Sequence, residues 1–294
     1  MNVHLFGATS SPSCAAFSLK RTAKDNISQF SKEAVSTVER YFYDDDLLKS
    51  VLDPSSGVKL AAELKQLLSL GGYRLKKWFS NSEEVMNSIP VEDRAKSRTK
   101  VDLDTDSLCE RTLGLQWHVN HDQFVFDVIL HNKGTTRRNI LSVASSLYDP
   151  LGLVAPVTLI PKIILQRACR LNLGWDERIP SADAEKWSQW LASLPALSNV
   201  SIDRCVIPSE LDRLTLKAEL HMFSDASEFA YGSAVYLKVY DASGKGKCSL
   251  IIGKSRLAPI KAMSIPRLEL AAAVVAVKLY QIVMEELDIQ ISGK

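Results

Sequence analysis

Two short stretches of the sequence combine carboxylates with apolar flanks. The first is the run Asp44-Asp45-Asp46, which lies between two apolar runs. The second ends an apolar run with Asp225, and Glu269 follows in an apolar segment farther along the chain. Carboxylates held at the end of a strand, or on a helix that lies against a sheet, are a common way to bind divalent metal for phosphoryl chemistry. The sequence therefore predicts two separate metal-dependent sites.

The elements around the first acidic run predict a β-hairpin. Residues 38–43 and 47–51 are rich in aromatic and β-branched side chains, and the acids between them form a tight break. A solvated turn without chemistry is the alternative, and a bare Asp run is more often a turn. Upstream, Gly7 leads into a helix for which Ser11 suits the N-cap and Pro12 the first turn.

The rest of the first third alternates between apolar and polar segments. Residues 59–70 place four leucines on one helical face before Gly71-Gly72, which predicts a helix that ends there. Residues 81–106 are polar and turn-rich, which predicts a loop without chemistry. Residues 111–117 and 123–128 predict a second hairpin.

The middle of the chain predicts helices, and the last third predicts a sheet followed by a helix. Helical patterns run over residues 137–148 and 161–171, and Ser181 opens a third helix in which Trp187 and Trp190 share a face. A tryptophan pair at this spacing is more often core than a base-stacking platform. Three strands and one long helix follow; their expected bounds are 220–225, 230–240, 248–255 and 268–287.

Composition bounds the class of protein. The 294 residues are 46% hydrophobic, enough for two or three domains with real cores, and the net charge of +2 excludes a polycation. Residues 131–178 hold seven Lys or Arg against three acids, which suits either contact with a phosphate backbone or a solvated basic face.

Cysteine usage and hydropathy bear on the cellular compartment. The five cysteines are scattered without CxxC spacing, so neither a disulfide framework nor a zinc knuckle is expected. No signal peptide and no membrane-spanning run is visible, which predicts an intracellular protein, cytoplasmic or nuclear, that does not contact a membrane.

Several motifs resemble one known lineage. The Gly7-x3-Ser11-Pro12 helix entry and Tyr43-x-Asp45-Asp46 resemble the template-contacting helix and the catalytic YxDD hairpin of reverse transcriptases. Phe223-Ser224-Asp225-Ala226-Ser227, with Tyr231-Gly232 and Arg267-Leu268-Glu269, resembles retroelement ribonuclease H. Residues 6–12, 71–78 and 148–153 (FGATSSP, GGYRLKKW and YDPLGL) are similar to the pol polyprotein of BEL/Pao-type retrotransposons, and this resemblance runs through essentially the whole chain.

The resemblance implies an α+β chain of three parts. Residues 1–130 are expected to form the C-terminal half of a reverse transcriptase palm, and residues 131–215 a helical thumb-like or connection region. Residues 216–294 are expected to form the N-terminal half of a ribonuclease H-like α/β fold. Asp225 is expected mid-sheet on the first strand of that fold, and Glu269 on the helix packed against it.

The resemblance also assigns roles to single residues. Asp45 and Asp46 in the palm, and Asp225 and Glu269 in the ribonuclease H-like part, are expected to be catalytic and to bind Mg²⁺. Lys77 lies near where related enzymes place a lysine that assists the departing pyrophosphate, and Leu113-Gly114 looks like the primer-grip turn. The residues expected to contact nucleic acid are Gly7, Pro12, Tyr43, Lys77, Leu113 and Gly114. The expected partners are an RNA–DNA hybrid or other nucleic acid and the remainder of the pol polyprotein.

Departures from the family pattern predict an inactive fragment. Asp44 occupies a position that is usually small or apolar, and a third adjacent acid adds repulsion that could misplace the metals. The first polymerase Asp is expected before Met1, and the later ribonuclease H acids after Lys294, so both active sites are expected to be incomplete. A non-catalytic nucleic-acid-binding remnant or domesticated protein is the alternative. In the resembled family, the stretch that follows the palm also carries the name Pao retrotransposon peptidase. An aspartic peptidase is the last-ranked alternative, because the run Asp104-Thr105-Asp106-Ser107 lacks the Asp-Thr/Ser-Gly triplet that such an enzyme needs.

Overall fold

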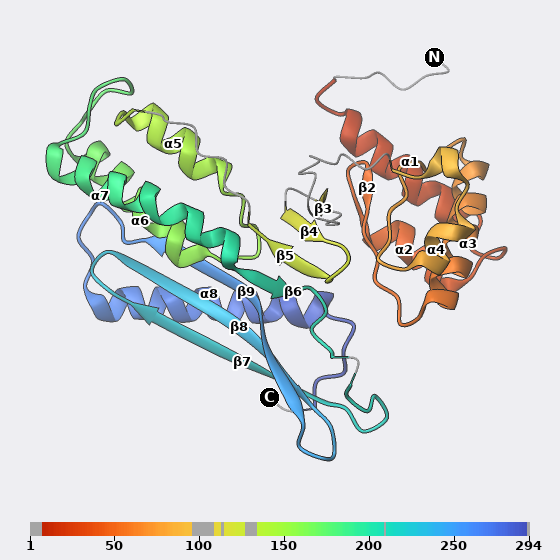
Figure 1. Cartoon of the computed structure of the whole chain (residues 1–294). Coiled ribbons are helices and arrows are strands. Elements are labelled where there is room, and N and C mark those ends of the chain that lie inside the picture. Colours follow the sequence, from red (N-terminus) through yellow and green to blue (C-terminus); the bar gives the residue numbers. More distant parts are fainter. Residues whose placement is uncertain (1–7, 96–108, 113–114, 127–133, 209, 293–294) are drawn as a thin grey trace. The chain divides into compact units, whose positions relative to one another are not determined.

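A computed structural model describes residues 8–95, 109–112, 115–126, 134–208 and 210–292 (Figure 1). The chain divides into two compact units, residues 1–113 and 114–294. Three positions expected to contact nucleic acid, Gly7, Leu113 and Gly114, lie outside the described residues, as does the run 104–107. No helix in the described ranges is both long and apolar enough to cross a membrane.

The first unit is built on three helices that enclose one apolar core. They are α1 (Ser11–Asp25), α2 (Lys32–Arg40) and α3 (Pro54–Leu70). The leucine face predicted for α3 is buried in this core, together with residues from α1 and α2. The four leucines are Leu60, Leu64, Leu67 and Leu68.

Helix ends in this unit follow local capping chemistry, with one correction. Asp53 caps α3 by accepting a hydrogen bond from the Ser56 backbone N–H, and Ser31 caps α2 in the same way. Ser11, predicted as the N-cap of the first helix, is instead its first helical residue. The N-cap position is Ser10, whose side chain makes no capping bond.

The predicted hairpin around the acidic run is present but shorter than expected. Its strands are β1 (Phe42–Tyr43) and β2 (Asp46–Leu47), which pair antiparallel. The prediction that the first strand begins at Val38 is wrong, because Val38 belongs to α2. Ala34, Val35 and Val38 are all buried on one side of that helix, so a spacing of three to four residues outweighs the local β-propensity.

The segment predicted to be a loop from residue 81 contains helical turns. Ser82 caps a short helix, α4 (Glu83–Ser88), and a 3₁₀ turn, η1 (Val91–Asp93), follows. Ser82 before two acids is an N-terminal helix signal, so α4 could have been predicted. The last strand of this unit is β3 (Cys109–Thr112).

The second unit begins with three antiparallel strands and a group of helices. The strands are β4 (Leu115–His118), β5 (Gln123–Val125) and β6 (Ser201–Asp203). The helices are α5 (Arg137–Ser146), α6 (Ala155–Arg170), α7 (Ser181–Ser193) and the 3₁₀ helix η2 (Leu194–Asn199). The core placement predicted for the tryptophans is confirmed: Trp187 and Trp190 are buried and stack with their ring centroids 4.9 Å apart.

A second sheet and a long helix complete this unit. The strands β7 (Lys217–Ala226), β8 (Ala230–Tyr240) and β9 (Gly246–Leu257) pair antiparallel in the order β7-β8-β9. Helix α8 (Ile265–Glu286) runs along one face of this sheet, mainly over β7 and β8 (Figure 1). These elements match the predicted strand–strand–strand–helix order. Within the described residues β7 is an edge strand, so the expectation that Asp225 lies mid-sheet is wrong.

The helical segment before this sheet packs directly on β9. The Gly253 backbone N–H donates to the Leu151 carbonyl at 2.7 Å, and the Gln166 side chain of α6 donates to the Ala258 carbonyl at 2.6 Å. Gly152 has φ +73°, and a Cβ there would lie 1.9 Å from the Gly253 carbonyl oxygen. The middle of the chain and the last sheet are therefore one packed body.

Candidate functional site

The acidic hairpin of the first unit presents its carboxylates at a tight turn. Tyr43 pairs with Asp46, so Asp44 and Asp45 form a two-residue loop. Asp44 has φ +49°, a left-handed conformation that Asp tolerates better than most side chains and that two-residue hairpin loops require. An Asp at position 44 is therefore compatible with this turn.

The two faces of this hairpin differ. Phe42 and Leu47 pair with each other and pack against the unit's core. Tyr43 and Asp46 form the next pair and are exposed, as is Asp45. Because side chains alternate along a strand, packing of the Phe42–Leu47 pair turns the Tyr43–Asp46 pair toward solvent. The structure thus brings Asp45 and Asp46 together at an open tip.

Lys77 lies after α3 in a constrained segment. It has φ +58° and is exposed. The next residue, Trp78, is hydrogen-bonded through both its backbone N–H and its carbonyl. The Trp78 N–H donates to the Asp93 carbonyl and the Ala95 N–H donates to the Trp78 carbonyl, each at 2.9 Å. The backbone that follows Lys77 is therefore held by pairing with Asp93 and Ala95.

Asp93 is a buried carboxylate that the sequence reading placed in a loop without chemistry. It accepts from Lys65 Nζ at 3.0 Å and from Arg74 Nη2 at 2.9 Å. The hydrogen bond from Lys65, followed by that from Arg74, lowers the pKa of Asp93 below its ordinary value. These groups line a cavity of about 310 Å³ at the end of α3. Because its partners are 28 and 19 residues away, short-range patterns gave no signal for Asp93.

In the second unit, Asp225 lies one residue before the end of β7. It is exposed, and its carboxylate accepts from the Ala226 backbone N–H at 2.8 Å. The residue paired with it on β8 is Gly232, which has no side chain to cover the carboxylate. Ser227 closes the turn between the strands: its N–H donates to the Ala230 carbonyl at 2.8 Å, and its hydroxyl accepts from the Phe229 and Ala230 N–H groups.

Glu269 lies in the second turn of α8 and is exposed. The Ser233 hydroxyl of β8 donates to the Ala272 carbonyl of α8 at 2.6 Å, which fixes this end of the helix on the sheet. Ser233 pairs with Ser224, so alternation places Ser224 on the helix-covered face and Asp225 on the opposite face. Asp225 and Glu269 therefore occupy the same end of the sheet–helix layer, on either side of β7.

The donor atoms at both acidic positions suit Mg²⁺, because carboxylate oxygens are the ligands that this ion prefers. In the part of the chain that the structure describes, no group of three or more His, Cys, Asp or Glu side chains could hold a metal ion. Mg²⁺ is often held by one or two carboxylates with water and substrate phosphates. Asp45 and Asp46, adjacent at the hairpin tip, are therefore suited to one weakly held ion, whereas strand alternation puts Asp225 and Glu269 on opposite sides of β7. Neither position fits a two-metal centre.

Several of the cations in residues 131–178 contact other groups of the same chain. Arg138 pairs with Asp176 through two hydrogen bonds of 2.7 and 3.0 Å, and this hydrogen bonding lowers the pKa of Asp176. Arg167 pairs with the buried Asp183 at 2.9 Å, and Arg137 donates to the Leu173 carbonyl. These cations hold the helices together, which leaves less charge for a phosphate backbone than the composition indicated.

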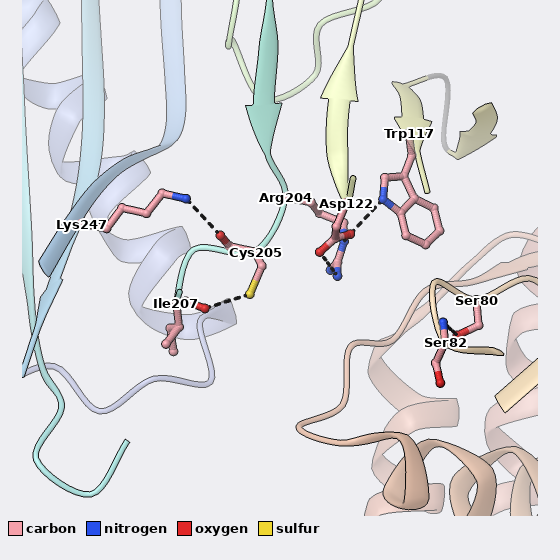
Figure 2. Close-up of polar contacts among 8 residues, drawn as sticks. All are labelled: Ser80, Ser82, Trp117, Asp122, Arg204, Cys205, Ile207 and Lys247. Atoms are coloured by element: carbon pink, nitrogen blue, oxygen red, sulfur yellow. Dashed lines mark hydrogen bonds and ion pairs between the residues drawn. The ribbon is translucent and has the colours of Figure 1, made fainter. Parts of the chain in front are cut away.

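A second polar cluster, which the sequence did not predict, joins the turn between β4 and β5 to the segment after β6 (Figure 2). Arg204 donates to both Asp122 carboxylate oxygens, at 2.6 and 2.9 Å, and Trp117 Nε1 donates to Asp122 at 2.9 Å. Trp117, considered as an ordinary buried hairpin residue, is half-buried and takes part in this polar contact. Lys247 of β9 reaches the same region and pairs with Asp203 at 2.6 Å.

Three antiparallel strands followed by a helix, with an acid at the end of the first strand and another in the helix, define a ribonuclease H-like arrangement. A family model described as the Pao retrotransposon-like RNaseH-like domain matches residues 136–294. The match covers more than half of the chain, and the chain therefore belongs to this Pao retrotransposon family. Its start at residue 136 agrees with the packing of the middle helices on β9. A comparison with the curated proteins finds no match.

Proposed function

We propose that this chain is a segment of a retrotransposon pol polyprotein whose ribonuclease H-like part contacts an RNA–DNA hybrid. Asp225 and Glu269 are each proposed to supply an oxygen ligand for divalent metal at the hybrid's scissile strand. The observation that carries the proposal is the pair of exposed carboxylates at one end of the β7–α8 layer, where the Ser233–Ala272 hydrogen bond fixes the helix.

The first unit is proposed to derive from the C-terminal half of a reverse transcriptase palm. Its support is the exposed Asp45–Asp46 turn, which stands on a hairpin anchored to the core by Phe42 and Leu47. In this reading Tyr43, Pro12 and Lys77 belong to the nucleic-acid-facing surface. Residues 131–215, which precede the last sheet, are proposed to form a thumb-like or connection region.

The chain is proposed to catalyse neither DNA synthesis nor hybrid cleavage alone. Two-metal phosphoryl chemistry needs both ions fixed in register, and missing ligands cost orders of magnitude in rate. Within the described residues neither acidic position offers a group of three or more metal ligands. A divalent ion held by the carboxylates there would lack the second ion that completes the reaction.

The binding part of this proposal is tested by filter binding of the whole chain to an RNA–DNA hybrid at several salt concentrations. Contact with phosphates makes the logarithm of the association constant fall linearly with the logarithm of the salt concentration. Undetectable or salt-insensitive binding would rule out the hybrid as a partner. Binding that is unaffected by Mg²⁺ and by Glu269→Gln supports instead a non-catalytic nucleic-acid-binding remnant.

A further inference from the structure

A groove separates the outer side of α8 from the helix-side face of β9. It has a volume of about 440 Å³, and its walls come from α8, from the segment before α8 and from the strand ends. Its apolar lining includes Leu270 and Val274. Three cations line it: Arg256, Arg267 and Lys278. No acidic residue is among the described residues that line the groove.

The three cations that line the groove are not paired with other groups in the described part of the chain. Within the described ranges, none of them forms an ion pair or a side-chain hydrogen bond, and all three are exposed. This distinguishes them from Arg138 of α5 and Arg167 of α6, which pair with carboxylates of the same unit. The groove therefore carries an uncompensated positive charge and is complementary to an acidic ligand.

The apolar lining narrows the choice of acidic ligand. Leu270 is 67% exposed and Val274 is 48% exposed, although both lie on a helix whose opposite side is buried. A phosphodiester backbone offers no apolar surface to cover such side chains. Covering them with aliphatic groups is favourable by roughly 25 cal/mol per Å². A ligand with both carboxylates and aliphatic side chains fits this surface better than a nucleic acid does.

We propose that this groove binds an acidic amphipathic helix of a second protein. Its aliphatic side chains cover Leu270 and Val274, and its carboxylates pair with Arg256, Arg267 and Lys278. The groove-lining part of α8 runs from Arg267 to Lys278, which is roughly 16 Å at 1.5 Å per residue. A partner helix of about three turns is therefore sufficient, with apolar residues at i, i+4 and i+7.

The test uses the whole chain and a labelled synthetic helix of about 14 residues, with Leu at those positions and Glu between them. Fluorescence anisotropy measures its binding to wild type, Leu270→Asp and Lys278→Glu. The matched control is Val277→Asp, because Val277 is 49% exposed on the same helix but does not line the groove. Circular dichroism and thermal melting check that every variant is folded. Two further probes are the same peptide with Lys for Glu and an oligothymidylate of equal net charge.

The proposal predicts that Leu270→Asp and Lys278→Glu each weaken the acidic peptide at least tenfold, while Val277→Asp changes its affinity less than twofold. The Lys peptide is expected not to bind. Equal binding of the acidic peptide by wild type and both groove variants would overturn the proposal. So would a failure of the acidic peptide to bind the folded wild-type chain. If oligothymidylate binds more tightly than the peptide, and the same two variants weaken its binding, the groove would be assigned to nucleic acid instead.

Discussion

At the residue scale, Asp53 links a capping contact to the pH dependence of stability. Its carboxylate accepts from the Ser55 hydroxyl at 2.6 Å and from the Ser56 backbone N–H at 2.9 Å and hydroxyl at 2.7 Å. These hydrogen bonds, led by that from Ser55, lower the pKa of Asp53 to about 2. A lowered pKa contributes stability above the ordinary value near 3.8 and loses it as the pH falls toward 2.

The corresponding prediction compares wild type with Asp53→Asn, which keeps an oxygen acceptor but removes the charge. Wild type is expected to be the more stable protein at pH 6, and the difference is expected to vanish between about pH 4 and pH 2. Urea unfolding at several pH values measures it. A difference that stays constant down to pH 2 would show that the charge of Asp53 does not stabilise the helix.

A second prediction at this scale concerns the acids of the second unit. If a divalent ion binds at this end of the sheet–helix layer, Mn²⁺ is expected to broaden the backbone amide resonances of Gly232 and its neighbours, because a bound paramagnetic ion relaxes nearby nuclei. Glu269→Gln is expected to reduce this broadening strongly. Glu228→Gln, which removes an exposed carboxylate from the adjacent turn, should leave it unchanged. Equal loss in both variants would mean that Mn²⁺ binds this surface without a specific site.

Residues differ in how well sequence predicts them. Asp45, Asp46, Asp225 and Glu269 lie in short motifs, so their positions at a turn, a strand end and a helix could be predicted. Asp93 could not, because its role depends on cations that only the folded chain brings to it. The same holds for the contact of Arg204 with Asp122, which spans 82 residues.

At the scale of elements, periodicity predicted the long helices and strands better than their ends. The leucine spacing of α3 and the alternation of β8 are unambiguous. β8 has the expected bounds, and α3 ends at Leu70 as expected but begins at Pro54, five residues before the predicted start. Val38 was assigned to a strand because aromatic residues follow it, yet its burial with Ala34 and Val35 depends on α2 packing against the core. α6 begins six residues before the predicted start, because Pro161 was taken as a helix start and lies inside the helix.

The turn before α6 explains a motif that the sequence reading treated only as a helix break. Asp149 accepts from the Leu153 and Val154 backbone N–H groups at 2.8 and 2.9 Å, and Leu151 bonds to Gly253. Gly152 is required twice, by its left-handed φ and by the closeness of the Gly253 carbonyl. The motif therefore fixes the middle helices to β9.

This account predicts that Gly152→Ala destabilises the second unit strongly. Forcing a left-handed conformation on Ala costs about 1–2 kcal/mol, and the contact with the Gly253 carbonyl adds to it. Gly244→Ala is the matched control, since Gly244 has φ +82° but nothing within 4 Å of the position of a Cβ. Chemical denaturation should show a larger loss for Gly152→Ala than for Gly244→Ala. Equal losses would mean that the turn moves away from β9 without cost.

At the scale of the whole molecule, the chain is two packed units, and the family match lies within the second. The second unit belongs to the Pao retrotransposon family, and its match begins among the helices rather than at the first strand of the last sheet. A separate connection region, residues 131–215, was predicted before that sheet because the pattern of the sequence changes there from helical to strand-like. Contacts between α6 and β9 lie too far apart in the chain for such patterns to predict.

The most direct measurement is hybrid cleavage by the purified whole chain, with Mg²⁺ and a labelled RNA–DNA hybrid, beside a Glu269→Gln variant. The account holds that Asp225 and Glu269 supply only part of a metal centre. It therefore predicts no Mg²⁺-dependent cleavage by wild type above the level of Glu269→Gln, although wild type binds the hybrid. Robust cleavage by wild type that Glu269→Gln abolishes would contradict it.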